Sequence, residues 1–469
     1  MSRFNNPKML PGMLAEGVPQ PAERSVVEAP RPADSDPAAK RQFSAGSETQ
    51  PGMGQSLCFF VACIYLLSGY ANDFAYHYGR NKAYISTVTL VLMPIFYLLT
   101  GTPLRGLKAA SGKWWLAFAI WLVLAIPFSV WRYGSANMLS GYIPKNYMLF
   151  FFIGASVVTV RQCRRLMYVL GAGAFLVLLT CLAFGASENG RFAIPESLFF
   201  SNPNELGLQL ALNIMVLLFP FFGESLFAMI AAAAGIALSA FFLLKTGSRG
   251  VLIALLGTCV IAFLLSRHKA RIVALAVPLF AIVLAVIPAN TRHRLVFIFA
   301  KPETAQLNSE ADLSALESQL QREQMLKTSI VDTFTHPLFG VGPGEFPVAV
   351  AGEAQKTGEH VEWLGTHNTY SQIASEAGLP GFIFYIATLL TCLRTNYRLY
   401  RRAAGRKGLE DVAGLSYCML LCLAAFALST FFFHIAYSSY LPMLAGSSAA
   451  VYLCAQSQIQ KHAEFTAFS

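Results

Sequence analysis

The chain has 469 residues, of which 55% are hydrophobic and only 13% are charged, and its mean hydropathy is +0.51. Soluble globular domains carry about 25% charged residues, so this composition excludes that class and predicts a polytopic membrane protein. The net charge is +10. In a membrane protein the loops that hold the positive charges matter more than their total, and we expect membrane lipids rather than nucleic acid around them.

The N-terminal 54 residues are rich in Pro, Ala, Glu and Ser and show no apolar periodicity. This composition is typical of a disordered segment. It has no basic segment followed by an apolar core and a cleavage site, so it does not read as a signal peptide. We therefore expect residues 1–54 to form a disordered cytoplasmic tail.

Apolar runs of membrane-spanning length follow the tail. They predict an all-α protein of about twelve transmembrane helices, near residues 56–72, 83–101, 114–131, 142–160, 166–184, 205–222, 225–244, 250–266, 272–289, 378–396, 411–434 and 438–455. The first run is short and ends in Asn72 and Asp73.

Clusters of Lys and Arg in the loops set the predicted orientation, because such loops stay in the cytoplasm. With twelve spans and the N-terminus inside, every basic loop falls on the cytoplasmic side. The basic loops contain Arg105, Lys108 and Lys113; Arg161, Arg164 and Arg165; Arg267, Lys269 and Arg271; and Arg394, Arg398, Arg401, Arg402, Arg406 and Lys407. The predicted organisation is spans one to nine at 55–289, an outer loop at 290–366, spans ten to twelve at 367–456, and a cytoplasmic tail at 457–469.

The outer loop is the longest polar segment between predicted spans. Apolar residues at helical spacing predict a helix from Ser309 to Phe334. The dense glycines and prolines from His336 to Phe346 predict a compact, shaped loop. The sequence has no internal repeat of the kind that marks many secondary transporters.

Three outer polar sites are candidates for binding an anion or supporting that binding. Arg249, in the turn Lys245–Gly250, offers a planar fork of donors suited to a diphosphate, although a charged turn at the headgroups is the alternative. Arg322 lies on the predicted outer helix, where the alternative is a solvated face with local pairing of Arg322 or Lys327 to Glu323. Asn204 is predicted to cap a helix, with a supporting role also possible.

The stretch Thr366–Phe382 combines a histidine, an amide, hydroxyls and a carboxylate at the start of a span. On one helix, His367, Tyr370 and Ser371 would share a face, and Glu376 would lie half a turn away from His367. Gly378 is predicted to break this helix. His367 could act as a general base, since an ordinary imidazole pKa near 6.5 leaves it neutral at working pH; a capping or interfacial role is the alternative.

Little in the sequence suggests a metal or a disulfide framework. Glu310 and Asp312 have a spacing that could hold Mg²⁺ or Mn²⁺, but they lie in a Ser-rich run without a supporting ligand, which favours a solvated segment. No Cys/His cluster suggests zinc. The nine cysteines lie in apolar runs or beside basic loops, so we expect no disulfide framework.

Taken in order, these motifs resemble those of the O-antigen ligase and polymerase superfamily of polytopic bacterial membrane glycosyltransferases. The matching residues are Thr246-Gly247-Ser248-Arg249-Gly250, then Arg322, then His336-Pro337-Leu338-Phe339-Gly340-Val341-Gly342, then His367-Asn368 with Glu376, Gly378 and Gly381.

The resemblance implies a C-type glycosyltransferase architecture in the bacterial inner membrane, with both termini cytoplasmic and a large periplasmic loop. It implies an undecaprenyl-diphosphate-linked glycan as donor, a lipid A–core or growing polysaccharide as acceptor, and neither metal nor cofactor. His367 becomes the expected base, and Arg249 and Arg322 become the residues that hold the diphosphate. Supporting roles are expected for Ser248, Asn368, Glu376 and Asn204.

Within this chemistry, a ligase transfers a finished glycan to lipid A–core, whereas a polymerase extends an O-antigen or exopolysaccharide repeat. Both roles need the same base and the same arginines, so the sequence leaves both open. A lipid or sugar transporter is a less favoured alternative, because it would need charged residues near the centres of its spans, and the predicted spans are almost free of them. A structural assembly partner would leave the His and Arg residues unexplained.

Overall fold

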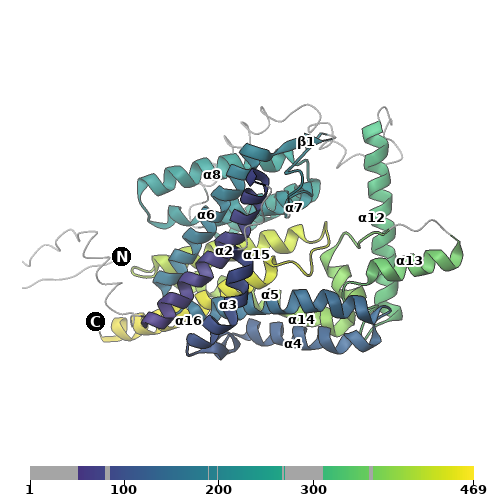
Figure 1. Ribbon diagram of the computed structural model, residues 1–469. Helices are drawn as coiled ribbons and strands as arrows, with labels where there is room; N and C mark the ends of the chain where they lie inside the picture. Colours follow the sequence, from purple (N-terminus) through teal and green to yellow (C-terminus); the bar gives the residue numbers. More distant parts are fainter. Residues whose placement is uncertain are drawn as a thin grey trace, which may run out of the picture. The chain divides into compact units, whose positions relative to one another are not determined.

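The computed structural model describes residues 51–79, 85–188, 190–197, 199–266, 269, 310–358 and 363–468 (Figure 1). The described chain is almost entirely helical, which confirms the predicted all-α membrane class. Its α-helices are α2 (Met53–Gly79), α3 (Ile85–Leu99), α4 (Ala110–Ala125), α5 (Arg132–Ser156), α6 (Val160–Phe184), α7 (Pro203–Val216), α8 (Leu226–Lys245), α9 (Arg249–Leu265), α12 (Glu310–Thr335), α13 (Phe346–Thr357), α14 (Thr369–Ala403), α15 (Glu410–Ser429) and α16 (Tyr440–Phe468). Short 3₁₀ helices η1 (Pro103–Lys108), η2 (Ile126–Phe128) and η3 (Phe219–Phe222) join some of them.

Within the described ranges, seven helical segments are long and apolar enough to cross a membrane. They are Met53–Tyr76, Ala110–Phe128, Val160–Phe184, Pro203–Phe222, Leu226–Lys245, Thr369–Ala403 and Glu410–Ser429. Two further apolar helices, Thr87–Leu99 and Arg249–Leu265, are shorter. The predicted spans at 142–160 and 438–455 fall on α5 and α16, which are helical but are not among these candidates, and the predicted span at 272–289 lies outside the described residues. The count of twelve therefore stays a prediction.

Two predicted boundaries differ from the structure. The first span was expected to end at Asn72 and Asp73, but α2 continues to Gly79. Asp73 is buried and accepts a hydrogen bond from the Ser197 hydroxyl, 2.8 Å away, which offsets the cost of burying a carboxylate. At the other end, α16 runs on to Phe468 through the expected C-terminal tail.

Helix α14 packs against α4, α12, α15 and α16. Aromatic side chains fill its contact with α4: Phe118 meets Tyr385 edge to face at 5.6 Å, and the Trp121 indole donates to the Ala377 carbonyl at 2.9 Å. Helix α15 is the most enclosed of the candidate spans, with 89% of its apolar window buried. The residues that begin α14 lie against this buried helix, where the Tyr370 hydroxyl donates to the Ala427 carbonyl at 2.6 Å.

The predicted outer helix exists as α12, and a compact loop follows it as expected. This loop, residues 336–345, is held against α14 by backbone hydrogen bonds. Val341 N–H donates to the Ser375 carbonyl at 2.8 Å, and Gly342 N–H donates to the Glu376 carbonyl at 3.1 Å. Helix α13 comes directly after the loop and was not predicted.

The predicted break in α14 is present at Gly378, where φ is +69° and ψ is −179°. Here the amide of Leu379 leaves the helical pattern and donates to the Pro337 carbonyl at 2.8 Å. A Cβ atom at position 378 would collide with the Leu338 carbonyl. Glycine is required at this position for both reasons: a left-handed φ and a close backbone approach.

A small antiparallel hairpin joins α6 to α7, and it was not predicted. Its strands β1 (Ala186–Glu188) and β2 (Arg191–Ala193) pair Ser187 with Phe192 and Glu188 with Arg191. The sequence between the strands is Asn-Gly, a common signal for a two-residue hairpin. Phe192 is buried and stacks on Phe242 at 4.9 Å, which anchors the hairpin to α8.

Candidate functional site

His367 lies in the turn that leads into α14 rather than on the helix itself. Its φ is +52°, a left-handed conformation that is uncommon for a residue with a side chain. Asn368 is the N-cap, and its side-chain oxygen accepts from the amides of Tyr370 and Ser371 at 2.8 and 3.1 Å. The predicted helical face shared by His367, Tyr370 and Ser371 is therefore wrong, because the helix begins only at Thr369.

The turn that carries His367 is fastened to the loop between α15 and α16, residues 430–439. Asn368 Nδ2 donates to the Phe431 carbonyl at 3.1 Å, and Thr369 Oγ1 donates to the Phe433 carbonyl at 2.8 Å. Thr369 Oγ1 in turn accepts from the Ile435 amide at 3.1 Å. These bonds fix the backbone on the C-terminal side of His367.

His434, from the same 430–439 loop, is the nearest aromatic neighbour of His367 that sequence reasoning missed. The two imidazole rings meet edge to face, with centroids 5.2 Å apart. A side chain at Gly365 would collide with the His434 ring, so glycine is needed there for close approach. No local signal in the sequence links two histidines that are 67 positions apart.

Arg249 and Arg322 lie near these histidines. Gly250, next to Arg249, packs so closely on Phe432 of the 430–439 loop that a side chain at position 250 would collide with it, and Arg322 is within electrostatic range of both Arg249 and His367. Partial burial, and then the positive charge of Arg249, lower the pKa of the Arg322 guanidinium. Partial burial, then His434, then Arg322 lower the pKa of His367 to about 4. We call Arg249, Arg322, His367 and His434 the basic cluster.

Of the two local pairings considered around Arg322, the one between Lys327 and Glu323 is present, with 2.8 Å between Nζ and Oε1 on the exposed side of α12. Glu323 does not pair with Arg322. The Nε atom of Arg322 is buried, and no other described residue accepts a hydrogen bond from it. Arg322 therefore keeps hydrogen-bonding capacity directed at something other than its own helix.

A polar network holds the turn between α8 and α9, where Arg249 is the first helical residue. Ser248 Oγ donates to Asn204 Oδ1 at 2.8 Å, and Arg191 Nη2 donates to the same oxygen at 2.9 Å. Arg191 Nε also donates to the Thr246 carbonyl at 3.2 Å. Ser248 and Asn204 thus support the position of Arg249, and Arg191 is a third arginine beside it that was not predicted.

The predicted capping role of Asn204 is wrong. The N-cap of α7 is Asn202, whose side chain accepts from the Asn204 amide at 2.9 Å, and Pro203 takes the first helical position. Proline favours that position because its missing N–H would be unpaired there anyway. This leaves the Asn204 side chain free to serve the turn at Ser248.

Glu376 supports the 336–345 loop rather than acting on the imidazole. It is buried, and its carboxylate accepts from the Gly344 amide at 3.1 Å and from Gln372 Nε2 at 3.5 Å. Gln372 Oε1 accepts from the Ala436 amide at 3.1 Å. One carboxylate therefore connects α14 to the 336–345 loop directly and to the 430–439 loop through Gln372.

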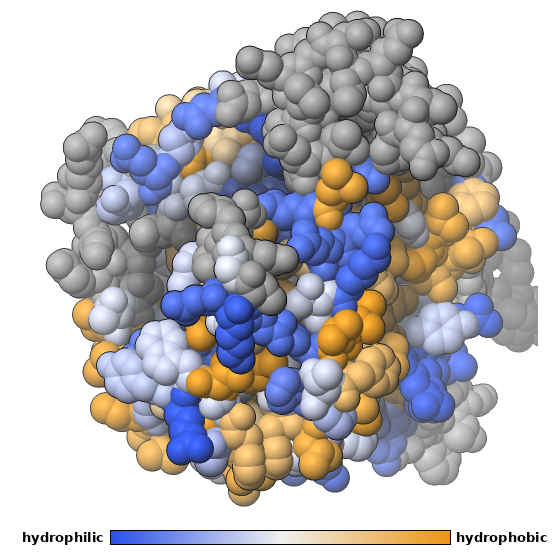
Figure 2. All heavy atoms as spheres, turned by 90° about the vertical axis from the view of Figure 1, so that its right-hand side faces the viewer, coloured by the Kyte–Doolittle hydropathy of each residue, from blue (hydrophilic) through white to orange (hydrophobic). Residues whose placement is uncertain are grey.

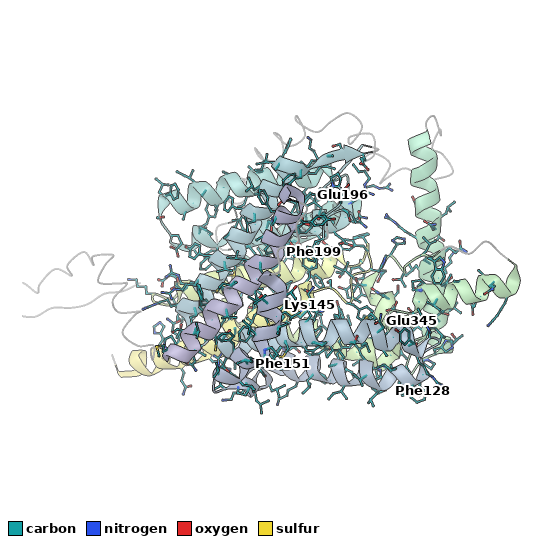
Figure 3. The ribbon with its side chains drawn as sticks, in the orientation of Figure 1. Phe128, Lys145, Phe151, Glu196, Phe199 and Glu345 are labelled. Atoms are coloured by element: carbon teal, nitrogen blue, oxygen red, sulfur yellow. The ribbon has the colours of Figure 1, made fainter. Side chains whose placement is uncertain are left out.

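Glu345 is a second buried carboxyl at this end of the molecule (Figure 3). Burial raises its pKa to about 7. Figure 2 shows the side on which α12 and α13 lie, and hydrophilic side chains gather in the middle of this face with hydrophobic ones beside and below them. The polar residues thus form a patch among apolar surroundings.

The carboxylate pair considered for a metal cannot be assessed from side chains, because those of Glu310 and Asp312 lie outside what the structure describes. Elsewhere in the described chain, no group of three or more His, Cys, Asp or Glu residues is arranged to hold a metal ion. None of the nine cysteines, all of which lie in the described ranges, forms a disulfide bond.

Comparison with known proteins adds one finding. Residues 234–386 match the family model described as O-antigen ligase. The match covers Arg249, Arg322, His367 and Glu376, but Arg191, Asn204 and His434 lie outside it. No curated protein matches the chain. The family match confirms the predicted resemblance: residues 234–386 of this multi-pass membrane protein are similar to the O-antigen ligase family of the ligase and polymerase superfamily.

Proposed function

We propose that the protein transfers a saccharide from an undecaprenyl-diphosphate carrier to an acceptor hydroxyl at the periplasmic face of the inner membrane, as an O-antigen ligase would. The observation that carries this proposal is the convergence of Arg249, Arg322 and His367, from three separate elements, in one basic cluster. A cluster of two guanidinium groups and a neutral imidazole suits a reaction in which an anion leaves while a hydroxyl loses its proton.

The proposed step is a single inverting displacement. The acceptor oxygen attacks the anomeric carbon and its proton passes to His367, while the bond from that carbon to the diphosphate oxygen breaks. The diphosphate leaves with the bonding electron pair, and the charge developing on it is stabilised by Arg249 and Arg322. Fixed donors of this kind are typically worth about 10²–10³ in rate.

The charge of the basic cluster links binding of the diphosphate donor to the pKa of the proposed base, His367. Partial burial, and then His434 and Arg322, lower the pKa of His367 to about 4, so the imidazole is neutral at physiological pH but is also a weak base. A bound diphosphate places negative charge beside the imidazole, and this would raise its pKa. The donor would therefore strengthen the base that its own transfer requires.

The first test is glycan transfer in nanodiscs from an undecaprenyl-diphosphate oligosaccharide, with EDTA present. We expect His367→Ala to lower the rate by about 10²–10⁴ and Arg249→Gln or Arg322→Gln by about 10²–10³. Lys327→Gln is the matched control for Arg322, since it removes an exposed positive charge from the same helix. Wild-type rates in folded His367→Ala protein would contradict the proposed base.

A polymerase that extends an O-antigen or exopolysaccharide repeat would use the same base and arginines. The products separate the two roles. A ligase transfers one glycan to lipid A–core, whereas a polymerase gives a ladder of lengthening lipid-linked chains. Movement of intact lipid-linked glycan across the bilayer without any transfer would instead support a transporter.

A further inference from the structure

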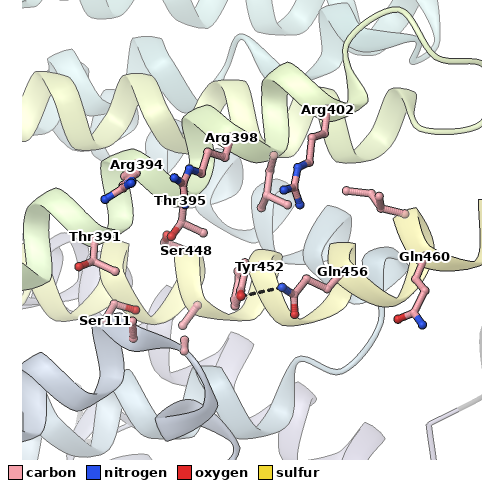
Figure 4. Close-up of a pocket in the computed structure, with 15 residues that line it drawn as sticks. Ser111, Thr391, Arg394, Thr395, Arg398, Arg402, Ser448, Tyr452, Gln456 and Gln460 are labelled. Carbon is pink, nitrogen blue, oxygen red and sulfur yellow. Dashed lines mark hydrogen bonds between the residues drawn. The ribbon is translucent and has the colours of Figure 1, made fainter. Parts of the chain in front are cut away.

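A second basic site lies at the far end of α14, away from the basic cluster. A cavity of about 710 Å³ opens between the N-terminus of α4, the last turns of α14 and the middle of α16 (Figure 4). Arg394, the first of its arginines, is 27 residues beyond His367. At 1.5 Å per residue this separation is about 40 Å along the helix. The cavity is therefore a separate site and has no place in the proposed transfer reaction.

Three arginines dominate the cavity wall. Arg394, Arg398 and Arg402 follow one another at four-residue intervals, so their side chains form one stripe along α14 and face α16 across the cavity (Figure 4). In the part of the chain that the structure describes, none of the three forms an ion pair with a carboxylate. Three guanidinium groups at this spacing repel one another, and an anion bound between them relieves the repulsion.

The remaining wall supplies neutral groups suited to a phosphate. Thr391 and Thr395 present hydroxyls from α14, and Gln456 Nε2 donates to the Tyr452 hydroxyl at 2.6 Å on α16. The first residues of α4, Ala110 and Ser111, also line the cavity, and the residue before them makes no side-chain cap. The unpaired amides of a helix N-terminus favour an anion.

Exposed apolar side chains one helical turn from cavity-lining residues indicate the source of the anion. Leu390, one turn before Arg394, is 57% exposed, and Trp114, one turn after Ala110, is 40% exposed. Both belong to candidate membrane spans. A basic cavity between helix ends with exposed apolar residues beside it matches a headgroup site with acyl chains alongside.

We propose that this cavity binds a phosphate-bearing anion, and that its source is the headgroup of an anionic phospholipid in the leaflet opposite the basic cluster. Arg394, Arg398 and Arg402 hold the phosphate, and the acyl chains lie along Leu390 and Trp114. General attraction of basic loops to the membrane surface does not explain this arrangement. Arg401, Arg406 and Lys407 belong to the same basic segment yet do not line the cavity.

The test compares two variants of the full chain, each lacking three positive charges. The cavity variant is Arg394→Gln, Arg398→Gln and Arg402→Gln; the control is Arg401→Gln, Arg406→Gln and Lys407→Gln. Each is purified in detergent, checked for its unfolding temperature, and titrated with phosphatidylglycerol, cardiolipin or phosphatidylcholine while bound lipid is counted by native mass spectrometry. Parallel titrations use inorganic phosphate.

We expect the wild type and the control to bind cardiolipin and phosphatidylglycerol, and the cavity variant to bind them at least about tenfold more weakly, because it loses charge-assisted hydrogen bonds. Phosphatidylcholine should bind weakly to all three. In a third outcome, the wild type and the control bind inorganic phosphate, the cavity variant does not, and no protein prefers anionic lipid. This result would support a phosphate site but contradict a lipid headgroup as its source. Equal binding by the cavity and control variants in every titration would overturn the proposal.

Discussion

The left-handed backbone conformation of His367 is held by hydrogen bonds of the residues on either side of it. A left-handed φ at a residue with a side chain costs of order 1–3 kcal/mol and persists only where the surroundings enforce it. Here Thr366 Oγ1 donates to the Asn368 carbonyl at 2.9 Å, and Asn368 caps the following helix. The turn thus presents the imidazole to Arg322 and His434 instead of laying it along α14.

The depressed pKa of His367 predicts the acid side of the pH–rate profile. The imidazole is neutral above its pKa and protonated below it, so kcat/KM, which reports the free enzyme, should stay high on lowering pH and fall with a midpoint near pH 4. In Arg322→Gln the midpoint should move upward, because one of the charges that lowers this pKa is gone. The measurement is kcat/KM for transfer between pH 3.5 and 8.

Lys327→Gln serves as the control for that profile, since Lys327 lies on the same helix but pairs with Glu323. Its midpoint should match that of the wild type. An acid midpoint that does not move in Arg322→Gln would show that Arg322 does not act on the titrating base.

At the scale of elements, the break in α14 is a feature that a local sequence signal predicted. Gly378 was predicted as a break from its position ahead of Pro380, and the structure adds the reason for the break. The interruption of α14 lets the Leu379 amide pair with the Pro337 carbonyl, so the 336–345 loop docks at the kink. The break is therefore a joint between two elements that both lie beside the basic cluster.

Gly378→Ala should consequently destabilise the protein. A positive φ with ψ near 180° is a region occupied essentially by glycine, so alanine there costs about 1–3 kcal/mol. The alanine Cβ would also collide with the Leu338 carbonyl. We expect a lower unfolding temperature in detergent and loss of transfer. Gly352→Ala in α13 is the control, because a Cβ there meets nothing within 4 Å and alanine favours a helix. Equal stability of the two variants would contradict this account of the kink.

Other elements show where sequence reasoning fails. Hydropathy predicted the apolar helices well, since each run carries its own signal. Asn204 was misassigned although Pro203 pointed to Asn202 as the cap, so a local signal was present there. Arg191 and His434 are different, because they join the site through contacts between segments far apart in the chain. Local propensity carries no information about such contacts.

At the scale of the whole molecule, positive charge gathers at two ends of α14. The basic cluster precedes its first turn, and the arginine-lined cavity surrounds its last turns. The Lys and Arg pattern predicts that the second end is cytoplasmic and that the outer loop is periplasmic. With this orientation, the proposed transfer and the proposed lipid site lie at opposite leaflets, at the two ends of the kinked helix α14.

This orientation can be measured by cysteine labelling in a variant whose nine native cysteines are replaced by Ala or Ser. Gln324→Cys on α12 and Lys407→Cys after α14 both place the thiol at an exposed position. In right-side-out vesicles an impermeant maleimide should label only Gln324→Cys, and in inverted vesicles only Lys407→Cys. The reverse pattern would put the basic cluster in the cytoplasm, where a periplasmic transfer could not occur, and would refute the proposed function and the leaflet assignment together. Labelling of both positions on one side would mean that α14 does not span, which the apolar length of this helix argues against.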